Sequence, residues 1–345
     1  MINYLILIPI HNEEKVINNT INSILRISYD SNFFKIIFLL DNCDDNSLNI
    51  IKNCNLDYIE KKDNQIKGKS FAIKWLIENY KDIENYSKII ILDADSLIDA
   101  NFLNKISENK DEKIIQGLVN PIFNRDSIFS SLSGYSELIS QKLKDTIKSK
   151  LNWSVVLRGT GMVIDKEIFK KYIPLLKTQI EDTELSILLV NDGYKIKFNP
   201  EAIVNDPKPL DIKQASNQRA RWLYGQFQII KYYWKVLIKI AFSSLGNFFF
   251  VLDIVFKPKT LFYLIKLFLL IIFIFSQLPF RTFFIIILSL IIFIDFLYFI
   301  IGGIFIEDKK HYYKTLLYSP IYIIIWVLSI IKMLLVRGKK WLKAR

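Results

Sequence analysis

Short apolar runs, separated by polar connectors rich in Asn, Asp and Lys, mark residues 1–225. Each run is bounded by turn residues and is short enough to be a buried strand. Two stretches between the runs, Glu13–Ile27 and Ser70–Asn79, have a helical pattern. This alternation predicts an α/β domain with a mainly parallel sheet that helices cover on both faces. The predicted strands are Leu5–Ile10, Ile36–Leu40, Ile89–Leu92 and Ile114–Leu118.

Three much longer apolar blocks lie in residues 258–345. They have almost no polar residues that could face water, and the first two carry one charge each, Lys266 and Asp295. The hydrocarbon core of a bilayer is about 30 Å thick, and helices of this length and composition can cross it. We therefore expect a membrane domain of about three transmembrane helices, at Leu261–Ser276, Thr282–Ile306 and Leu316–Val336.

The segment 226–257 joins these two parts. Its lysines Lys231, Lys235 and Lys239 recur every four residues, and aromatic and aliphatic side chains occupy the other faces of the helix. This spacing predicts an interfacial amphipathic helix that lies flat on an anionic membrane surface. The alternative is a fourth crossing by Val236–Phe256, which would bring the basic tail 337–345 to the cytoplasmic side, as the positive-inside rule favours.

The first apolar run does not have the pattern of a targeting signal. It is only seven residues long, at Tyr4–Ile10, and it continues directly into the polar sequence His11-Asn12-Glu13-Glu14. We therefore expect domain 1–225 to stay in the cytoplasm, as part of a multi-pass protein of the plasma or inner membrane.

The composition agrees with a protein that has a soluble and a membrane part. Hydrophobic residues make up 51% of the chain, and its net charge is +12. Two Cys and two His exclude a disulfide scaffold and a Cys- or His-based zinc site, so any metal must have oxygen ligands. The basic excess concentrates near the membrane segments, where anionic lipid attracts it, so we expect membrane lipids and not nucleic acid as partners.

Acidic residues follow two of the predicted strands. Asp41 comes directly after the second strand, and Asp93 and Asp95 come after the third. Ligands bind such sheets beyond the carboxyl ends of the strands, and carboxylates there suit Mg²⁺ or Mn²⁺ bridging a pyrophosphate. The alternative is that Asp93 and Asp95 cap the next helix. Residues 1–225 contain no glycine-rich nucleotide cradle.

A series of short motifs follows in a fixed order along the first 225 residues. The series resembles the family-2 inverting glycosyltransferases of the GT-A fold, in particular the membrane-embedded branch related to cellulose, hyaluronan and poly-N-acetylglucosamine synthases. The resemblance implies a Rossmann-like nucleotide-diphospho-sugar transferase domain followed by transmembrane helices. The motifs are Pro9–Glu14, Asp41–Asp45, Gly68–Ala72, Asp93-Ala94-Asp95, Arg158–Met162, Glu181–Glu184 and Gln218–Trp222.

The resemblance implies a donor site for a nucleotide sugar, with UDP as the expected nucleotide. Asp41 would contact the uracil and ribose, and Asp93 would contact the ribose and donor. Asp95 would be the ligand of Mg²⁺ or Mn²⁺, and Lys69 would meet the charge of the donor. The alternatives are that Asp41 caps a helix over residues 44–52 and that Lys69 is an ordinary solvated lysine.

Asp182 matches the catalytic base of this family, and the neighbouring Glu181 would contact substrate. Inverting transfer needs a base that takes the proton of the acceptor hydroxyl while that oxygen attacks the anomeric carbon. Ile180 stands where the family usually has threonine, which changes local hydrogen bonding but not the carboxylate. The alternative is that both acids only complement the dipole of the helix that follows.

Gln218, Arg221 and Trp222 share one face of a helix because they are spaced i, i+3 and i+4. The resemblance implies that Arg221 faces the diphosphate, that Gln218 hydrogen-bonds nearby and that Trp222 stacks on a sugar. The alternative is a buried Trp and an Arg that meets no phosphate. Gly159 and Gly161 would let the backbone approach a ligand closely or would form a tight turn.

The function implied is transfer of a sugar, with inversion, from a nucleotide sugar to a saccharide acceptor in cell-surface polysaccharide synthesis. Three spans are fewer than channel-forming synthases have, so a partner subunit or a lipid-linked acceptor would complete the system. One alternative is a polyprenyl-phosphate or glycolipid sugar transferase. The other is a non-catalytic membrane protein that binds nucleotide sugars.

Overall fold

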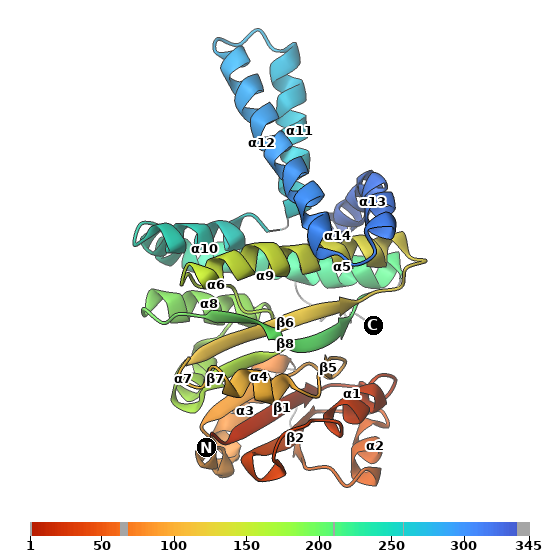
Figure 1. The fold of residues 1–345 in the computed structure, drawn as a ribbon, viewed down its shortest axis with the longest axis vertical. Helices are drawn as coiled ribbons and strands as arrows, with labels where there is room; N and C mark the ends of the chain where they lie inside the picture. Colours follow the sequence, from red (N-terminus) through yellow and green to blue (C-terminus); the bar gives the residue numbers. More distant parts are fainter. Residues whose placement is uncertain (1, 63–67, 210, 258, 337–345) are drawn as a thin grey trace. The chain divides into compact units, whose positions relative to one another are not determined.

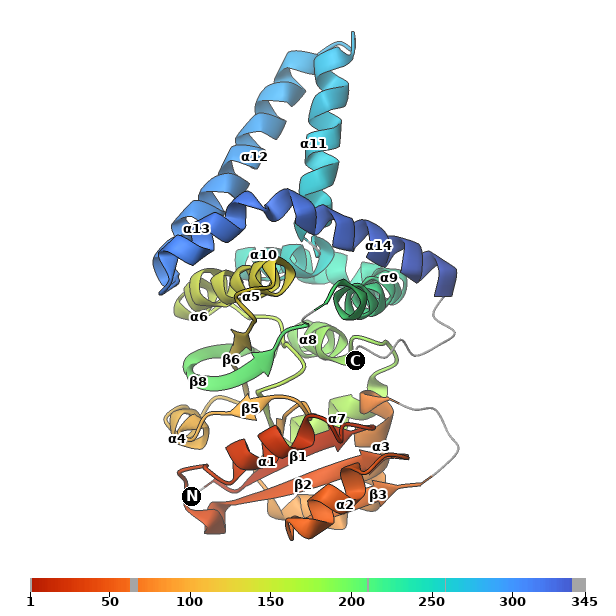
Figure 2. The same ribbon diagram turned by 90° about the vertical axis from the view of Figure 1, so that its right-hand side faces the viewer.

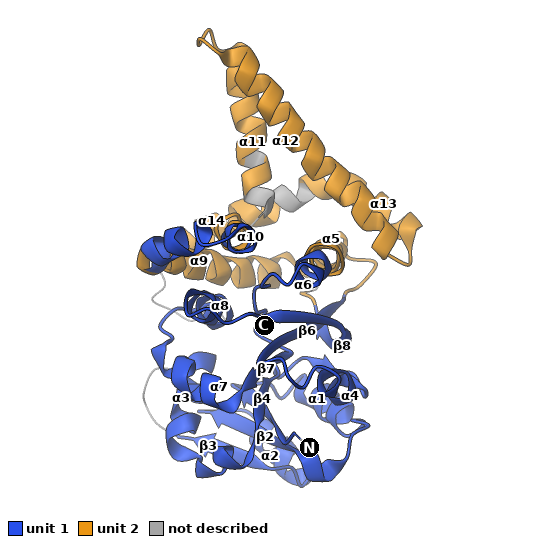
Figure 3. Cartoon of the chain, turned by 60° about the vertical axis from the view of Figure 1, so that its left-hand side comes forward, with its two compact units in different colours: residues 1–122, 145–207, 233–251 blue, residues 123–144, 208–232, 252–345 orange. Residues whose placement is uncertain are grey.

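The computed structural model describes residues 2–62, 68–209, 211–257 and 259–336. The chain divides into two compact units (Figure 3). The first unit contains residues 1–122, 145–207 and 233–251, and the second contains residues 123–144, 208–232 and 252–345. The predicted membrane domain therefore falls in the second unit, and the predicted strands fall in the first.

The first unit is built on an eight-stranded sheet with the order β3-β2-β1-β4-β7-β6-β8-β5. Strands β3, β2, β1 and β4 are parallel neighbours, and β8 is parallel to β6, whereas β7 is antiparallel to β4 and β6, and β5 is antiparallel to β8. The strands are β1 Tyr4–Ile10, β2 Phe34–Asp41, β3 Tyr58–Lys61, β4 Lys88–Ile91, β5 Leu97–Ile98, β6 Ile114–Ile122, β7 Met162–Asp165 and β8 Lys197–Pro207.

The sheet is mixed, but six of its eight strands run in one sense, so the prediction of a mainly parallel sheet holds apart from β7 and β5. The four predicted strands are confirmed as β1, β2, β4 and β6, and all four run in the same sense. The antiparallel pairings come from β7 and β5, which have only four and two residues. Runs this short carry too little periodicity to be recognised in the sequence.

Helices cover both faces of this sheet. The side chains of Ile6, Ile8 and Ile10 of β1 pack in one buried cluster with helices α1 (Ile17–Ile24), α2 (Ser47–Asn53) and α4 (Phe102–Ser107). Side chains alternate between the faces of a strand, so the buried Leu5 and Leu7 point to the other face, where α3 (Lys69–Asn79) and α7 (Lys166–Tyr172) lie (Figure 3).

The register of the parallel strands makes the chain leave several strands at the same edge of the sheet. Ile10 of β1 lies opposite Leu40 of β2, and Leu7 lies opposite Ile91 of β4. The residues that follow β2 and β4 therefore leave the sheet at the same carboxyl edge, where ligands are expected. Helix α8 (Glu181–Asn191) and helix α9 (Ile212–Ala241) follow later in the chain, and α9 runs without a break through residue 225.

The second unit is helical in the described residues. It contains α5 (Ile128–Ile139), the first part of α9, α11 (Lys259–Phe275), α12 (Arg281–Gly302), α13 (Lys309–Leu317) and α14 (Tyr322–Val336). Helices α11 and α12 form a hairpin (Figure 1, Figure 2), in which Lys266 pairs with Asp295 and the rings of Phe273 and Phe284 stack at 4.7 Å. The two charges of the predicted spans therefore neutralise each other.

The three predicted spans do not all appear as long helices. Among the described residues, one helical stretch, Arg281–Phe305, is long and apolar enough to cross a bilayer, and Leu245–Val255, Ile265–Phe275 and Ile324–Leu335 are shorter apolar helices. The third block is interrupted between α13 and α14, and its Ile325 and Trp326 are buried against Leu132 and Ala215. The basic tail 337–345 lies outside the described residues.

Candidate active site

Asp41 ends strand β2 and is 2% exposed. Its Oδ1 accepts from Lys61 Nζ at 3.0 Å and from Asn42 Nδ2 at 2.9 Å, and its Oδ2 accepts from the backbone N–H of Gly68 at 3.1 Å. The carboxylate thus joins the ends of β2 and β3 to the start of α3. It caps no helix over residues 44–52, because α2 begins at Ser47 and has Asn46 as its N-cap.

Lys69 begins α3 and lies among carboxylates, not in open solvent. Its Nζ is 2.5 Å from Asp93 Oδ1, 2.5 Å from the carbonyl oxygen of Gly159 and 3.6 Å from Glu181 Oε1. Burial lowers the pKa of Lys69, but the nearby charges of Asp93 and Glu181 outweigh burial and raise this pKa overall. The side chain therefore stays a cation, which excludes the solvated alternative.

The turn at Gly159 lies over this charge cluster. Gly159 has φ +82°, a left-handed conformation that glycine adopts without strain. A Cβ on Gly159 would be 3.6 Å from Asp182 Oδ2, 3.8 Å from Lys69 Nζ and 3.9 Å from Asp93 Oδ2. Side chains from α3, from the end of β4 and from α8 thus converge on one backbone position, and the glycine leaves space between them.

Buried polar side chains hold this turn. Gln116 is fully buried on β6; its Nε2 donates to the carbonyl of Thr160 at 3.0 Å, and its Oε1 accepts from the N–H of Arg158 at 2.8 Å. The hydroxyl of Thr160 accepts from the N–H of Asp93 at 3.1 Å. Gln116 and Thr160 therefore fix the loop 158–161 relative to the end of β4.

Asp182 lies in the first turn of α8, as the sequence predicts, and Glu181 precedes it. Oδ1 of Asp182 accepts from the N–H of Thr183 at 2.6 Å, whereas Oδ2 is the atom closest to the Gly159 position. Ile180 is the N-cap and has no side-chain cap hydrogen bond, as expected where the family has threonine. The helix thus directs one carboxylate oxygen toward the cluster.

Asp93 and Asp95 precede a strand, β5, so the alternative that they cap the next helix is wrong; α4 has Asn101 as its N-cap. Burial raises the pKa of Asp93, Lys69 opposes this shift, and Asp206 and Glu181 add to it.

Asp95 is half-buried. No group of three His, Cys, Asp or Glu in the described residues could hold a metal ion. Asp95 fits an ion that takes its other ligands from water and phosphate.

Asp206 is a site residue that sequence reasoning missed. It lies near the carboxyl end of β8, with Oδ1 3.5 Å from Ser96 Oγ, and its charge adds to the rise of the Asp93 pKa. The signal was present, because Asp206 follows the apolar alternation of Ala202 and Val204 in the way that Asp41 and Asp93 follow their strands. The same edge of the sheet therefore has a fourth aspartate.

Gln218, Arg221 and Trp222 lie on α9, so their predicted helical spacing is confirmed. Trp222 is 41% exposed, which contradicts the alternative of a buried tryptophan. These three residues belong to the second unit, whereas Asp41, Lys69, Asp93, Asp95, Glu181 and Asp182 belong to the first. Their place beside a donor stays a prediction.

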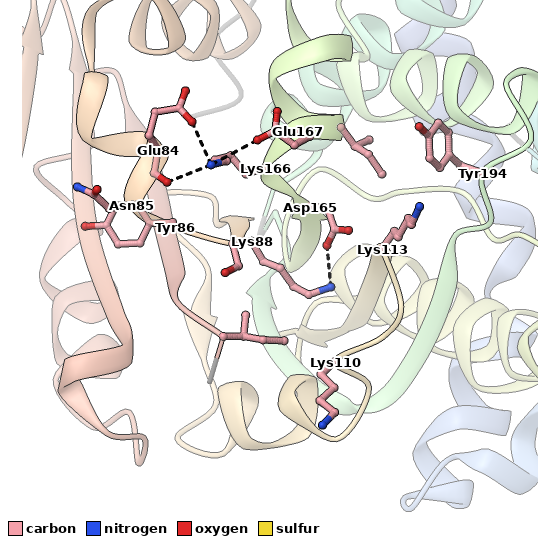
Figure 4. A pocket seen from close by; sticks show the side chains of 13 residues that line it. Glu84, Asn85, Tyr86, Lys88, Lys110, Lys113, Asp165, Lys166, Glu167 and Tyr194 are labelled. Atoms are coloured by element: carbon pink, nitrogen blue, oxygen red, sulfur yellow. Dashed lines mark hydrogen bonds and ion pairs between the residues drawn. The ribbon is translucent and has the colours of Figure 1, made fainter.

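A cavity of about 640 Å³ in the first unit is lined by residues at the opposite edge of the sheet (Figure 4). Lys88, at the start of β4, pairs with Asp165 at 2.8 Å, and Lys166 pairs with Glu84 at 3.0 Å and with Glu167 at 3.3 Å. None of the predicted site residues lines this cavity. It is therefore separate from the carboxylate cluster.

Comparison with known proteins agrees with the predicted family. The family model described as "Glycosyl transferase family group 2" matches residues 88–335. The chain is 29% identical over 261 residues to the probable glycosyltransferase YdaM of Bacillus subtilis (strain 168), covering 71% of this chain and 61% of that protein. It is 26% identical over 236 residues to the poly-beta-1,6-N-acetyl-D-glucosamine synthase of Staphylococcus aureus (strain COL), covering 65% of this chain and 54% of that protein.

The chain thus spans between half and two thirds of the length of these relatives. Among solved structures, the mannosyltransferase PcManGT from Pyrobaculum calidifontis, in complex with GDP-Man and Mn²⁺, matches with a TM-score of 0.55 and 12% identity, over 96% of this chain and 87% of that one. This likeness shows a shared glycosyltransferase fold. Because the family model extends from β4 to α14 and covers most of the sequence, the chain belongs to the glycosyl transferase family group 2.

Proposed function

We propose that the chain is a membrane-bound inverting glycosyltransferase that moves a sugar from a nucleotide sugar, with UDP as the favoured nucleotide, to a saccharide acceptor. The observation that supports this most is the convergence of Lys69, Asp93 and Asp182 on the Gly159 turn. At this turn, where Gly159 has no side chain, Lys69 would provide a cation for a diphosphate and Asp182 a base for a hydroxyl.

Asp182 Oδ2 is the proposed base. It takes the proton of the acceptor hydroxyl while the acceptor oxygen forms a bond to the anomeric carbon. The bond from that carbon to the nucleotide diphosphate breaks, its electron pair goes to the leaving phosphate oxygen, and the anomeric configuration inverts. Oδ1 is engaged by the N–H of Thr183, which holds the carboxylate in one orientation.

The donor would lie along the carboxyl edge of the sheet. Asp41 would contact the nucleoside, Asp93 and Glu181 would contact the sugar nucleotide, and Lys69 would stabilise the diphosphate. Asp95 would hold Mg²⁺ or Mn²⁺, which supplies further positive charge for the diphosphate when bound. The fold match to a mannosyltransferase whose complex contains GDP-Man and Mn²⁺ is compatible with this arrangement.

We propose that helix α9 carries three further substrate-binding residues. Arg221 has a fixed positive charge suited to the leaving diphosphate, Gln218 would hydrogen-bond beside it, and the exposed ring of Trp222 would stack on the acceptor sugar. Similarity to a poly-beta-1,6-N-acetyl-D-glucosamine synthase supports a saccharide acceptor and a role in cell-surface polysaccharide synthesis.

We further propose that the enzyme is a multi-pass protein of the cell membrane, with its sheet domain in the cytoplasm. Support comes from the apolar helix Arg281–Phe305 and from the second half of α9, where Trp234 (52% exposed) and Ile238 (50% exposed) lie beside exposed Lys235 and Lys239. Such a surface suits anionic lipid headgroups. A lipid-linked acceptor or a partner subunit would bind next to it.

To test this proposal, a panel of UDP- and GDP-sugars is added with Mn²⁺ to membranes that contain the full chain, and the release of nucleotide is measured. We expect release with one class of donor, loss of release with a chelator, and a rate about 10³-fold lower in Asp182→Asn. Release that neither change affects would overturn the proposal. The size of labelled product separates a saccharide chain from the single-sugar lipid of a polyprenyl-phosphate transferase.

A further inference from the structure

Glu184 is a fully buried carboxylate that the proposed mechanism does not use. It lies on α8, two residues after Asp182. Its Oε2 accepts from the backbone N–H groups of Lys177 at 2.9 Å and Thr178 at 2.7 Å, and its Oε1 accepts from the hydroxyl of Tyr233 at 2.5 Å. Burial of a carboxylate is costly, and these three donors compensate for the lost water.

These bonds fix the chain that leads into α8. Ile180 has no side-chain oxygen for the helix start, so the chain before the helix must be held by other groups. Glu184 does this by accepting from the backbone N–H groups of residues 177 and 178. The ammonium of Lys177 lies 5.2 Å from the centre of the Tyr233 ring.

The opposite side of the first turn is also fixed. Residues two positions apart point to nearly opposite faces of a helix, so Glu184 and Asp182 face different neighbours. On the side of Asp182, the hydroxyl of Ser186 donates to the carbonyl of Asp182 at 2.7 Å and accepts from the N–H of Leu157 at 2.9 Å. The turn that carries Asp182 is therefore held from both sides.

We propose that Glu184 and Tyr233 are positioning residues that fix the start of α8 and thereby aim Asp182 Oδ2 at the acceptor hydroxyl. This inference rests on the proposed role of Asp182 as the base. Tyr233 belongs to α9, so the bond also ties that helix to the start of α8 within the first unit. Neither residue contacts substrate; both act through Asp182.

The test is Tyr233→Phe, which removes one hydroxyl and keeps the ring. Tyr172→Phe is the matched control, because the hydroxyl of Tyr172 donates to Asp192 at the other end of α8, about 15 Å along the helix from Asp182. Both tyrosines are buried and both lose a bond to a carboxylate. Glu184→Gln is the second variant, and it places N–H groups against the backbone donors of residues 177 and 178.

We measure kcat and KM for nucleotide release with the most active sugar nucleotide of the panel, together with hydrogen exchange of residues 177–183. Tyr233→Phe should lower kcat about tenfold, because misplaced catalytic groups cost rate, while the donor KM changes less than about twofold. Exchange at residues 177 and 178 should accelerate. Tyr172→Phe should keep kcat within about twofold of wild type.

A wild-type kcat in Tyr233→Phe, or an equal fall of kcat in both tyrosine variants, would overturn the inference. Asp182→Asn, measured in parallel, separates this failure from failure of the proposed function. If Asp182→Asn is inactive and Tyr233→Phe is normal, only the positioning role fails. If Asp182→Asn turns over like wild type, Asp182 is not the base, and the proposed function fails with it.

Discussion

The two edges of the sheet in the first unit both carry lysine–carboxylate pairs, but they differ in charge balance. At the amino edge, Lys88 pairs with Asp165 and Lys166 pairs with Glu84, and two more lysines, Lys110 and Lys113, line the same cavity. At the carboxyl edge, two lysines, Lys61 and Lys69, lie among five acids, Asp41, Asp93, Glu181, Asp182 and Asp206. Acids outnumber the lysines only at the carboxyl edge.

The backbone differs between the two edges as well. The carboxyl edge has a glycine in a left-handed conformation directly beside its acids, whereas the charges of the amino edge are paired with each other along β4, β7 and α7. Ion pairs by themselves therefore do not identify a site. Excess carboxylate charge beside a backbone position without a side chain is what fits a base and a bound cation.

The largest difference between the edges is expected for removal of a carboxylate. Asp182→Asn should lower kcat about 10³-fold, because the amide cannot accept the acceptor proton. Glu167→Gln, which neutralises an exposed acid at the amino edge, should leave kcat unchanged. Initial rates of nucleotide release measure both, and equal rates in the two variants would remove the distinction between the edges.

Removal of a lysine should have the next largest effect. Lys69 and Lys166 have equally exposed side chains, 17% each, and each pairs with two carboxylates. Lys69→Met should weaken binding of the nucleotide diphosphate about 30-fold, because a charge-assisted contact is lost and the acids repel the ligand. Lys166→Met should bind as wild type does. Calorimetric titration measures the affinity of each variant for the nucleotide diphosphate. Comparable affinities of Lys69→Met and Lys166→Met would contradict the role of Lys69.

Alanine substitutions at two glycines distinguish the effect of backbone strain from the effect of a methyl group that fills the site. Gly159 has φ +82° and Gly193 has φ +83°, but a Cβ on Gly193 would meet nothing within 4 Å. Both alanine variants should lose about 1 kcal/mol of unfolding free energy. Only Gly159→Ala should also lose activity, about tenfold, because its methyl group occupies substrate space beside Asp182. Equal activity losses would show that strain alone matters.

The smallest expected effect is on stability. Burial raises the pKa of Asp93, so folding favours its protonated form; this stabilisation is complete below the unfolded pKa near 3.9 and is lost as pH rises through the folded pKa. At pH 7, Asp93→Asn should therefore melt no lower than wild type, and any difference should vanish near pH 4. A variant that melts several degrees lower at pH 7 would contradict this sign.

Much of this organisation was predictable from the sequence because it depends on local pattern. Continuous apolar runs marked β1, β2, β4 and β6, and the acids that follow β2 and β4 do lie at one edge. The acidic start of α8 was also correctly located. These features need only strand length and the rule that parallel strands end together.

The remaining features depend on tertiary contacts that no local pattern contains. The antiparallel strand β7 has four residues and is defined by its neighbours β4 and β6. A local apolar alternation precedes Asp206, but its place in the cluster depends on the pairing of β8 beside β6. The third apolar block is broken between α13 and α14, and its Trp326 packs in the second unit; the hydrophobicity of the block does not reveal either feature.

The most direct test of the two edges is the position of Mn²⁺ in crystals of the full chain grown with UDP or GDP, read from anomalous difference density. We predict a peak at coordination distance from Asp95, with the diphosphate beside Lys69. Density for the diphosphate in the cavity of Lys88, Lys110 and Lys113, with none beside Asp95, would contradict it.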